Sequence, residues 1–258
     1  MERDRNFFQI FLSTDGAASS ALPPLIEAAS AESRAHLRDF HYRRWDMTSL
    51  RDFLTACFTK EVLAAFDALM PLAYKADLGR YCLLYHYGGW YSDISLKIVS
   101  ADLALIARDA GLCFFRDYGE GMPSPHGSSF DCQNSLIYAQ SGHPVMARCI
   151  QKILHNVQHQ FYGLSSTAPT GPSLFGSVLA ESQLATARQV GFFLPLTQGF
   201  LNRNLAYVSD TGQILAWHKT SWHPSRARGG DLSSLGLSGT NNYNQLWRER
   251  RVYAKPNQ

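Results

Sequence analysis

The chain has 258 residues, of which 45% are hydrophobic and 17% charged, and a formal net charge of +3. This composition is typical of a folded protein and excludes a disordered or low-complexity chain. The sequence contains no apolar run of the ~18 residues that a membrane-spanning helix needs, and the small net charge does not point to a nucleic-acid partner. The five cysteines are scattered without a C-x-x-C pair, which indicates a reducing compartment and no zinc ribbon.

The first third of the chain is predicted to alternate strands with helices. In chain order we expect a strand at 7–12, a helix over 23–38 with proline in its first turn, a strand at 41–45, helical segments over 50–70 and a buried helix over 74–87 that stops at Gly88-Gly89. The next segment, 90–99, alternates as one strand would, with Ile94, Leu96 and Ile98 on one face and Asp93, Ser95 and Lys97 on the other.

The remainder continues this alternation. We expect strands at 112–115, 135–138 and 192–196, helices over 143–162 and from Thr170-Gly171-Pro172, a hairpin of 206–208 with 214–217, and a short polar helix over 244–252. Such alternation favours an α/β sandwich with a mixed central sheet flanked by helices. We therefore predict a single domain spanning residues 1–258.

The C-terminal segment, residues 218–258, is distinctly basic. It holds seven cationic side chains against Asp231 and Glu249, namely Lys219, Arg226, Arg228, Arg248, Arg250, Arg251 and Lys255. A segment of this kind suits a phosphate-bearing ligand or peripheral contact with an anionic membrane, and equally a solvated face. The N-terminus, MERDRNFF, carries charges where a secretory signal has an apolar stretch. We expect a cytoplasmic protein, peripheral at the inner membrane face, with a secreted effector as the alternative.

The densest group of polar side chains surrounds the glycine pair. Asp77 and Arg80 are three residues apart on an otherwise apolar helix, so they share one face. Gly88-Gly89 allows a tight turn, and Asp93 follows on the next predicted strand. These residues are expected to converge on one pocket. The alternative is a buried ion pair that only stabilises the helix, with Asp93 capping a turn.

This segment resembles the glycosyltransferases of family 32, the DXD sugar transferases, with the large glucosylating toxins as more distant relatives. The family pattern A-D-x-x-R-Y-x-x-L-Y-x-Y-G-G-x-Y-x-D-x-D is matched at Ala76, Asp77, Arg80, Tyr81, Leu84, Tyr85, Tyr87, Gly88, Gly89, Tyr91 and Asp93. Weaker matches run from about residue 6 to 223, at Gln9–Leu12, Tyr42–Asp46, Asn134, His143-Pro144, Thr170–Pro172, His218 and Ser221-Trp222. The resemblance implies a GT-A-type, Rossmann-like nucleotide-sugar transferase domain.

The chain departs from the family at the last position of the D-x-D motif, which is Ser95. In the family this carboxylate helps to hold a divalent metal that bridges the donor's two phosphates. Mg²⁺ or Mn²⁺ prefers oxygen ligands, and a neutral hydroxyl is a weaker one. The metal is therefore expected to bind loosely, to use Asp93 and His218 as ligands, or to be absent. The same departure supports an alternative function, a catalytically inactive nucleotide-sugar or glycan binder.

The resemblance also implies roles for individual residues. The expected catalytic group is Asp93, Asp77 and Arg80, and the expected donor-binding set is Phe11, Asp77, Arg80, Tyr91, Asp93, Ser95, Asn134, His218 and Trp222. Phe11 would stack on the base, Asp77 and Arg80 would contact sugar hydroxyls, and Asn134 would lie beside the sugar. His218 would reach the diphosphate or the metal. From the pattern alone, Phe11 is equally a core residue and His218 an ordinary core or surface histidine.

The expected activity is transfer of a hexose from a UDP- or GDP-sugar to a hydroxyl of a glycan, lipid-linked or protein acceptor, with retention of configuration. Competing chemistry has little support in the sequence. His155 and His159 are four residues apart but lack the glutamate of a metalloprotease motif, and neither a phosphate loop nor a dinucleotide fingerprint is present. A third alternative is a purely structural partner protein, which requires the polar residues to be buried and mutually satisfied, with no cleft beside Asp93.

Overall fold

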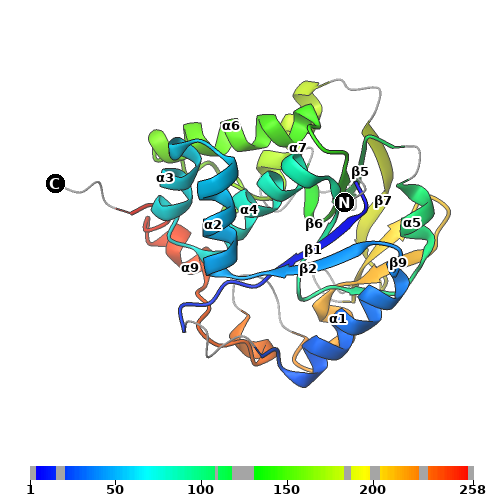
Figure 1. Cartoon of the computed structure of the whole chain (residues 1–258). Helices are drawn as coiled ribbons and strands as arrows, with labels where there is room; N and C mark the ends of the chain where they lie inside the picture. The colour runs from blue at the N-terminus through cyan, green and yellow to red at the C-terminus, as the bar shows by residue number, and fades with distance from the viewer. Residues whose placement is uncertain are drawn as a thin grey trace.

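The computed structural model describes residues 4–15, 21–107, 110–117, 131–182, 187–197, 204–226 and 232–254. Strands and helices alternate through these ranges (Figure 1). The helices are α1 (Pro24–His36), α2 (Met47–Cys57), α3 (Lys60–Ala68), α4 (Leu72–Tyr87), α5 (Asp102–Ile106), α6 (Pro144–Gln158), α7 (Pro172–Ser182), α8 (Lys219–Trp222) and α9 (Tyr243–Arg248), with a 3-10 helix, η2 (Ser233–Leu235). Within the described ranges, none of the helices has the length and apolar character needed to cross a membrane.

The described strands form one mixed sheet. They are β1 (Asn6–Ile10), β2 (His41–Trp45), β3 (Gly89–Ser92), β4 (Lys97–Ile98), β5 (Leu112–Asp117), β6 (Cys132–Ala139), β7 (Ala187–Pro195), β8 (Leu205–Ser209) and β9 (Ile214–Trp217). Their order is β2-β1-β3-β6-β5-β7-β8-β9-β4. β1 pairs in parallel with β2 and β3, and β5 with β7, whereas β6 is antiparallel to both of its neighbours. The predicted α/β class with a mixed central sheet is confirmed.

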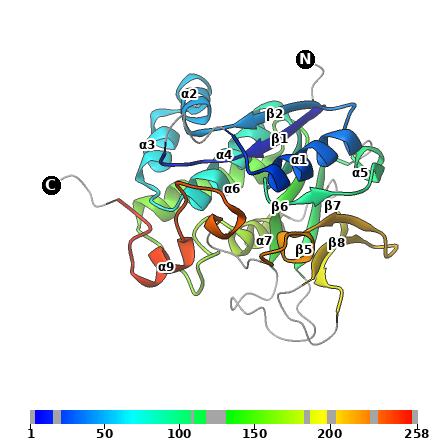
Figure 2. The same ribbon diagram turned by 90° about the horizontal axis from the view of Figure 1, so that it is seen from below.

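Helices cover the sheet unequally. In the larger apolar cluster, α2, α3, α4, α6 and α7 pack against one side of the sheet (Figure 1). In the second cluster, α5 and the connection that follows α1 pack against the other side. Helix α9 contacts α4 and is seen from below in Figure 2. The C-terminal segment is fixed there by two backbone hydrogen bonds, from Met70 N to Val252 O (2.9 Å) and from Ala254 N to Ala68 O.

Helix α4 lies in the middle of the larger cluster because it is apolar around most of its circumference. It begins after Pro71 and ends at Gly88, whose φ of 67° terminates the helix. Gly89 has φ 115°, and a Cβ there would lie 2.2 Å from the carbonyl oxygen of Asn6. Only glycine therefore lets β3 start directly beside β1. The predicted stop at the glycine pair is correct.

The prediction of one strand over 90–99 is wrong. β3 ends at Ser92, a turn closed by the hydrogen bond from Leu96 N to Asp93 O (3.0 Å) follows, and β4 pairs with the distant β9. The apolar residues of this segment alternate with polar ones, but they do not share one strand face, because Ile94 and Leu96 are buried in different apolar clusters. Ser95 is buried too, and Lys97 does not share a face with Asp93 but forms an ion pair with Glu32 (2.8 Å).

Most of the other elements were predicted with boundary shifts, whereas the short helices α5, α8 and η2 were not predicted. The helical region 50–70 is two helices, α2 and α3, and the hairpin of β8 with β9 forms as expected. The last helix is shorter than predicted because it ends at Arg248, after which Arg250 has a positive φ of 56°. Of the basic C-terminal side chains, Arg228 and Lys255 lie outside the described residues.

Candidate active site

The site is built at one edge of the sheet, where parallel strands end. Phe11 follows β1, Asp93 follows β3 and His218 follows β9. β6 runs in the opposite direction, so its first residues, including Asn134, reach the same edge. Polar groups gather at such an edge because the strand ends leave room for side chains and ligands there.

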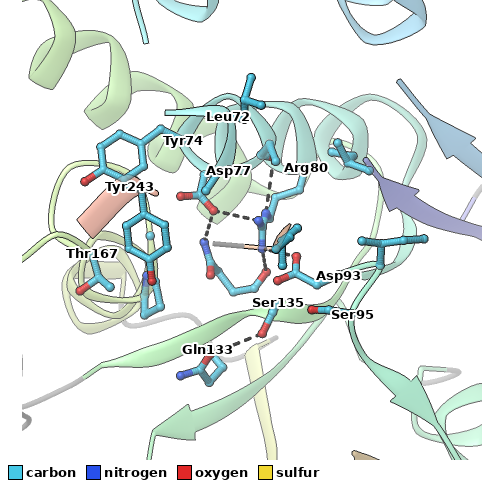
Figure 3. A pocket seen from close by; sticks show the side chains of 18 of the residues that line it. Leu72, Tyr74, Asp77, Arg80, Asp93, Ser95, Gln133, Ser135, Thr167 and Tyr243 are labelled. Atoms are coloured by element: carbon cyan, nitrogen blue, oxygen red, sulfur yellow. Dashed lines mark hydrogen bonds and ion pairs between the residues drawn. The ribbon is translucent and has the colours of Figure 1, made fainter. Parts of the chain in front are cut away.

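A cavity of about 280 Å³ opens at this edge. Among the described residues its wall includes all of the predicted donor-binding set except Trp222, together with Asp117, Gln133, Ser135, Phe193 and Lys219 and, at its far end, Tyr74, Thr167 and Tyr243. Figure 3 shows α4 passing along one wall and the start of β6 along the other. A cavity beside Asp93 is the opposite of what the purely structural alternative requires.

Arg80 is in direct contact with both Asp77 and Asp93. Arg80 lies between the two carboxylates, with Nη2 2.9 Å from Asp77 Oδ1 and Nη1 3.2 Å from Asp93 Oδ1 (Figure 3). Its guanidinium also lies 4.5 Å from the centre of the Tyr91 ring. One cation therefore fixes both acidic side chains, and the aromatic ring supports that cation from one face.

Asp77 and Arg80 belong to the interior, whereas Asp93 faces the cavity. Asp77 is 7% and Arg80 4% exposed, and the Asp93 side chain is 34% exposed. Burial raises the pKa of the Asp77 carboxyl, which the Arg80 charge and hydrogen bonds from Thr170 and Asn134 oppose. Asp93 is thus an accessible carboxylate that is held in place by a buried ion pair.

Asn134 and Thr170 complete the support of Asp77. Asn134 Nδ2 donates to Asp77 Oδ1 (2.8 Å) and to the Tyr81 hydroxyl (3.1 Å), and the Thr170 hydroxyl donates to Asp77 Oδ2 (2.6 Å). The Asn134 carbonyl accepts from Arg80 Nη1 (2.6 Å). Thr170 was not among the predicted site residues, although the Thr170-Gly171-Pro172 motif had drawn attention to that position.

Phe11 is a core residue that also lines the cavity, and its stacking on a base remains a prediction. It is 7% exposed and packs with Ile26, Ile94 and Leu235, and it also lines the cavity. Trp222 does not line the cavity. Its indole Nε1 donates to the Ser95 carbonyl (3.2 Å), which joins α8 to the turn after Asp93.

His218 is a half-buried, neutral side chain. Burial and the adjacent Lys219 charge lower its pKa to about 3. The Thr220 backbone N–H donates to its Nδ1 (3.3 Å), so the proton of the neutral ring is assigned to Nε2. Its Nδ1 also lies 2.9 Å from the Thr220 hydroxyl oxygen.

The residues around Asp93 do not fit a metal held by protein side chains. Within the described residues no three His, Cys, Asp or Glu side chains are grouped to hold an ion. Asp93 Oδ1 already accepts from Tyr91 (2.8 Å) and pairs with Arg80, and the second motif position is the Ser95 hydroxyl. The described side chains alone therefore do not enclose a metal ion, and the expected ligands Asp93 and His218 remain a prediction.

Two charged residues of the cavity wall were missed from the sequence. Asp117 ends β5 and accepts from Gln133 Nε2 (2.7 Å), and burial raises its pKa to about 6. Lys219 begins α8 and is 5% exposed. Asp117 has no spacing signal in the sequence, whereas Lys219 lies directly beside the singled-out His218 and was counted only as part of the basic segment.

Comparisons with known proteins agree with this geometry. Residues 14–106 match the family described as glycosyltransferase sugar-binding region containing DXD motif. Among curated proteins no match is found. Among solved structures the chain is similar to the PaToxG glycosyltransferase, with 14% identity, 70% of each chain covered and a TM-score of 0.51.

Two further structures are more weakly similar. The UDP-bound glycosyltransferase domain of the YGT toxin has 10% identity over 64% of this chain and 55% of that one, and apo mouse xyloside xylosyltransferase 1 has 12% identity over 72% and 84%. Both have TM-scores of 0.35, too low to define a fold. The family match includes Asp77, Arg80, Asp93 and Ser95. The resemblance found in the sequence is therefore confirmed over residues 14–106, and the described α/β fold is of the GT-A type.

Proposed function

We propose that this protein transfers a hexose from a nucleoside-diphosphate sugar to a hydroxyl acceptor with retention of configuration. The observation that carries the proposal is the contact of Arg80 with Asp77 and Asp93 at the wall of a cavity of about 280 Å³. A carboxylate held rigidly in a cavity favours the positive charge that develops at an anomeric carbon. The proposed acceptor is a glycan, a lipid-linked sugar or a protein hydroxyl.

In the proposed reaction the bond between the anomeric carbon and the β-phosphate oxygen breaks, and its electron pair leaves on the nucleoside diphosphate. The acceptor oxygen forms the new bond from the same face, and its proton passes to the departing phosphate. Asp93 faces the sugar, and Arg80 and Asp77 hold Asp93 in position. The Phe11 ring, at the end of β1, is placed to cover the base.

In this proposal, a divalent cation of the kind the family uses would bind together with the donor. Mg²⁺ and Mn²⁺ sites often use one or two carboxylates together with substrate phosphates. Asp93 is the one carboxylate that the described geometry offers beside Ser95. No step of the reaction above depends on such an ion.

The experiment incubates the protein with UDP-glucose, UDP-N-acetylglucosamine, UDP-galactose and GDP-mannose, with and without Mn²⁺, and follows release of nucleoside diphosphate. We expect release from at least one donor, and Asp93→Asn should abolish it. Because the Asp93 side chain is 34% exposed, the thermal melt of this variant should be nearly unchanged. Binding of a nucleotide without any release would contradict the enzyme proposal and favour the inactive binder, and full activity of Asp93→Asn would refute the role of Asp93.

A further inference from the structure

Asp117 is a carboxylate of the cavity wall that stands apart from the two carboxylates in contact with Arg80. It is the last residue of β5, lines the cavity and is half-buried. Its Oδ2 accepts one side-chain hydrogen bond, from Gln133 Nε2 (2.7 Å). Within the described residues no lysine or arginine pairs with Asp117, and its Oδ1 has no side-chain partner. This oxygen is therefore available to a ligand in the cavity.

The surroundings of Asp117 disfavour its charge. Burial raises the pKa of this carboxyl to about 6, and the charge of Asp131, just before β6, acts in the same direction. At neutral pH the protein thus keeps a charged group in a place where the charge is poorly solvated and has no facing cation. A carboxylate with a perturbed pKa in a cavity is a candidate ligand-binding group. Asp117 differs in this respect from Asp77, whose charge is balanced by Arg80.

The order of the strands places Asp117 on the side of the donor site away from the base. Along the edge of the sheet the order is β1, β3, β6, β5 and β7, and Phe11 follows β1, Asp93 follows β3 and Asp117 ends β5. Neighbouring strands lie about 4.8 Å apart, so two strand spacings, roughly 10 Å, separate Asp93 from Asp117. With the base at Phe11 and the transferred sugar at Asp93, the β5 side of the cavity remains for the acceptor.

The side chains next to Asp117 suit a neutral sugar. Gln133 and Ser135 line the cavity from the start of β6, and the Ser135 hydroxyl donates to Gln133 Oε1 (3.4 Å). Phe193 lines it from β7, where it is paired in register with Asp117. Carboxylate, amide and hydroxyl groups exchange hydrogen bonds with sugar hydroxyls, and an aromatic ring offers an apolar surface to the carbon skeleton. We call Asp117, Gln133, Ser135 and Phe193 the acceptor wall.

We propose that the acceptor wall binds a neutral sugar as the acceptor, with Asp117 accepting a hydrogen bond from one of its hydroxyls. The inference rests on the proposed function, and among the proposed acceptors it selects a glycan or a lipid-linked sugar over a protein hydroxyl. The hydroxyl held by Asp117 is not the one that reacts, so no proton is transferred to this carboxylate. The reacting hydroxyl forms the new bond to the anomeric carbon, and its proton passes to the departing phosphate, as in the proposed reaction.

The test offers the methyl glycosides of glucose, galactose, mannose and N-acetylglucosamine as acceptors, together with the nucleotide sugar that the protein turns over. At least one glycoside should accelerate the release of nucleoside diphosphate and give a disaccharide detected by mass spectrometry. Asp117→Asn should raise the KM for this glycoside about 10- to 100-fold, because a hydrogen bond to a charged group is lost. The KM for the donor, and the affinity for UDP or GDP measured by calorimetry, should stay within about twofold of the wild type.

Asp210→Asn is the matched control, because Asp210 directly follows β8, is exposed and is not among the described residues of the cavity wall. Its KM values should equal those of the wild type. An equal rise in the KM for donor and acceptor in Asp117→Asn would show a structural role and overturn the inference. Release of nucleoside diphosphate by the wild type without transfer to any glycoside would also overturn it, and both results leave the proposed function intact. Absence of donor turnover under every condition overturns the proposed function and this inference with it.

Discussion

Two carboxylates share one arginine in this site, yet their surroundings give them different tasks. Asp77 is 7% exposed and receives hydrogen bonds from Thr170 (2.6 Å) and Asn134 (2.8 Å). Asp93 is bonded to Tyr91 and faces the cavity. Loss of one partner of a buried ion pair is costly, because the remaining charge stays desolvated, whereas an accessible carboxylate is replaced at little cost to stability.

Asp77→Asn should therefore lower the free energy of unfolding by about 3 kcal/mol at pH 7, because Arg80 keeps only its more exposed partner. Urea denaturation followed by circular dichroism measures the change. Asp93→Asn is the control, with an expected loss below about 1 kcal/mol. Equal losses in the two variants would contradict the assignment of Asp77 to the interior.

The raised pKa of Asp117 predicts that the stability of the protein depends on pH. Burial raises its pKa to about 6, and the Asp131 charge acts in the same direction while the hydrogen bond from Gln133 opposes it. The folded chain thus holds this proton more tightly than the unfolded chain, in which an aspartate titrates near ~3.9. The contribution of Asp117 to stability is complete below about pH 4 and is lost as the pH rises through about 6.

Asp117→Asn stays neutral at every pH, so it should be more stable than the wild type at pH 8, by about 1–3 kcal/mol, and similar to it at pH 4. Denaturation at the two pH values measures the difference. A difference of the same size at both would show that titration of Asp117 does not contribute.

At the scale of elements, the site depends on how α4 passes into β3. The helix carries Asp77 and Arg80, the strand ends at Asp93, and the glycine pair between them brings β3 beside β1. A Cβ at position 89 would lie 2.2 Å from the Asn6 carbonyl oxygen, and backbone atoms cannot move aside as a flexible side chain can. The distance between Asp77 and Asp93 is therefore set by the backbone of this connection.

Gly89→Ala should destabilise the protein by about 3 kcal/mol or more, from backbone strain at φ 115° together with the steric clash. Gly212→Ala is the matched control, because Gly212 also has a positive φ (87°) but no atom within 4 Å of its added Cβ. There only the strain applies, about 1–2 kcal/mol. Chemical denaturation of both variants checks the comparison, and an equal cost would contradict the role of close packing at Gly89.

At the scale of the whole molecule, the two apolar clusters lie on opposite sides of one sheet. Trp45 belongs to the larger cluster and Trp90 to the second, and both are fully buried. The paired strands β1 and β3 contribute side chains to both clusters, so each cluster depends on the same two strands. The single domain predicted from the sequence remains a prediction, and cooperative unfolding is its consequence.

Unfolding in guanidinium should accordingly follow one transition, with the same midpoint by tryptophan fluorescence and by far-ultraviolet circular dichroism. Fluorescence reports the surroundings of the five tryptophans, among them Trp45 and Trp90, and circular dichroism reports the helices. Two separated midpoints would show that the clusters unfold independently and would refute the single domain.

The sequence by itself determined the local elements and the group of residues at the centre of the site. Proline at helix starts and glycine at the end of α4 define their own backbone geometry, and the spacing of Asp77 and Arg80 places both on one face. These features depend on neighbours within a few residues, so a pattern reveals them. The family motif added Asp93 for the same reason, because it lies in the same continuous segment.

Only the tertiary structure decided what depends on distant segments. The alternation over 90–99 favoured one strand, but the clusters that bury Ile94 and Leu96 come from remote parts of the chain and bend it into a turn. Thr170 reaches Asp77, and Lys219 reaches the cavity wall, through strand pairings that no local pattern encodes. A local pattern shows the periodicity with which side chains are buried. The packing of the whole chain determines which segments bury them.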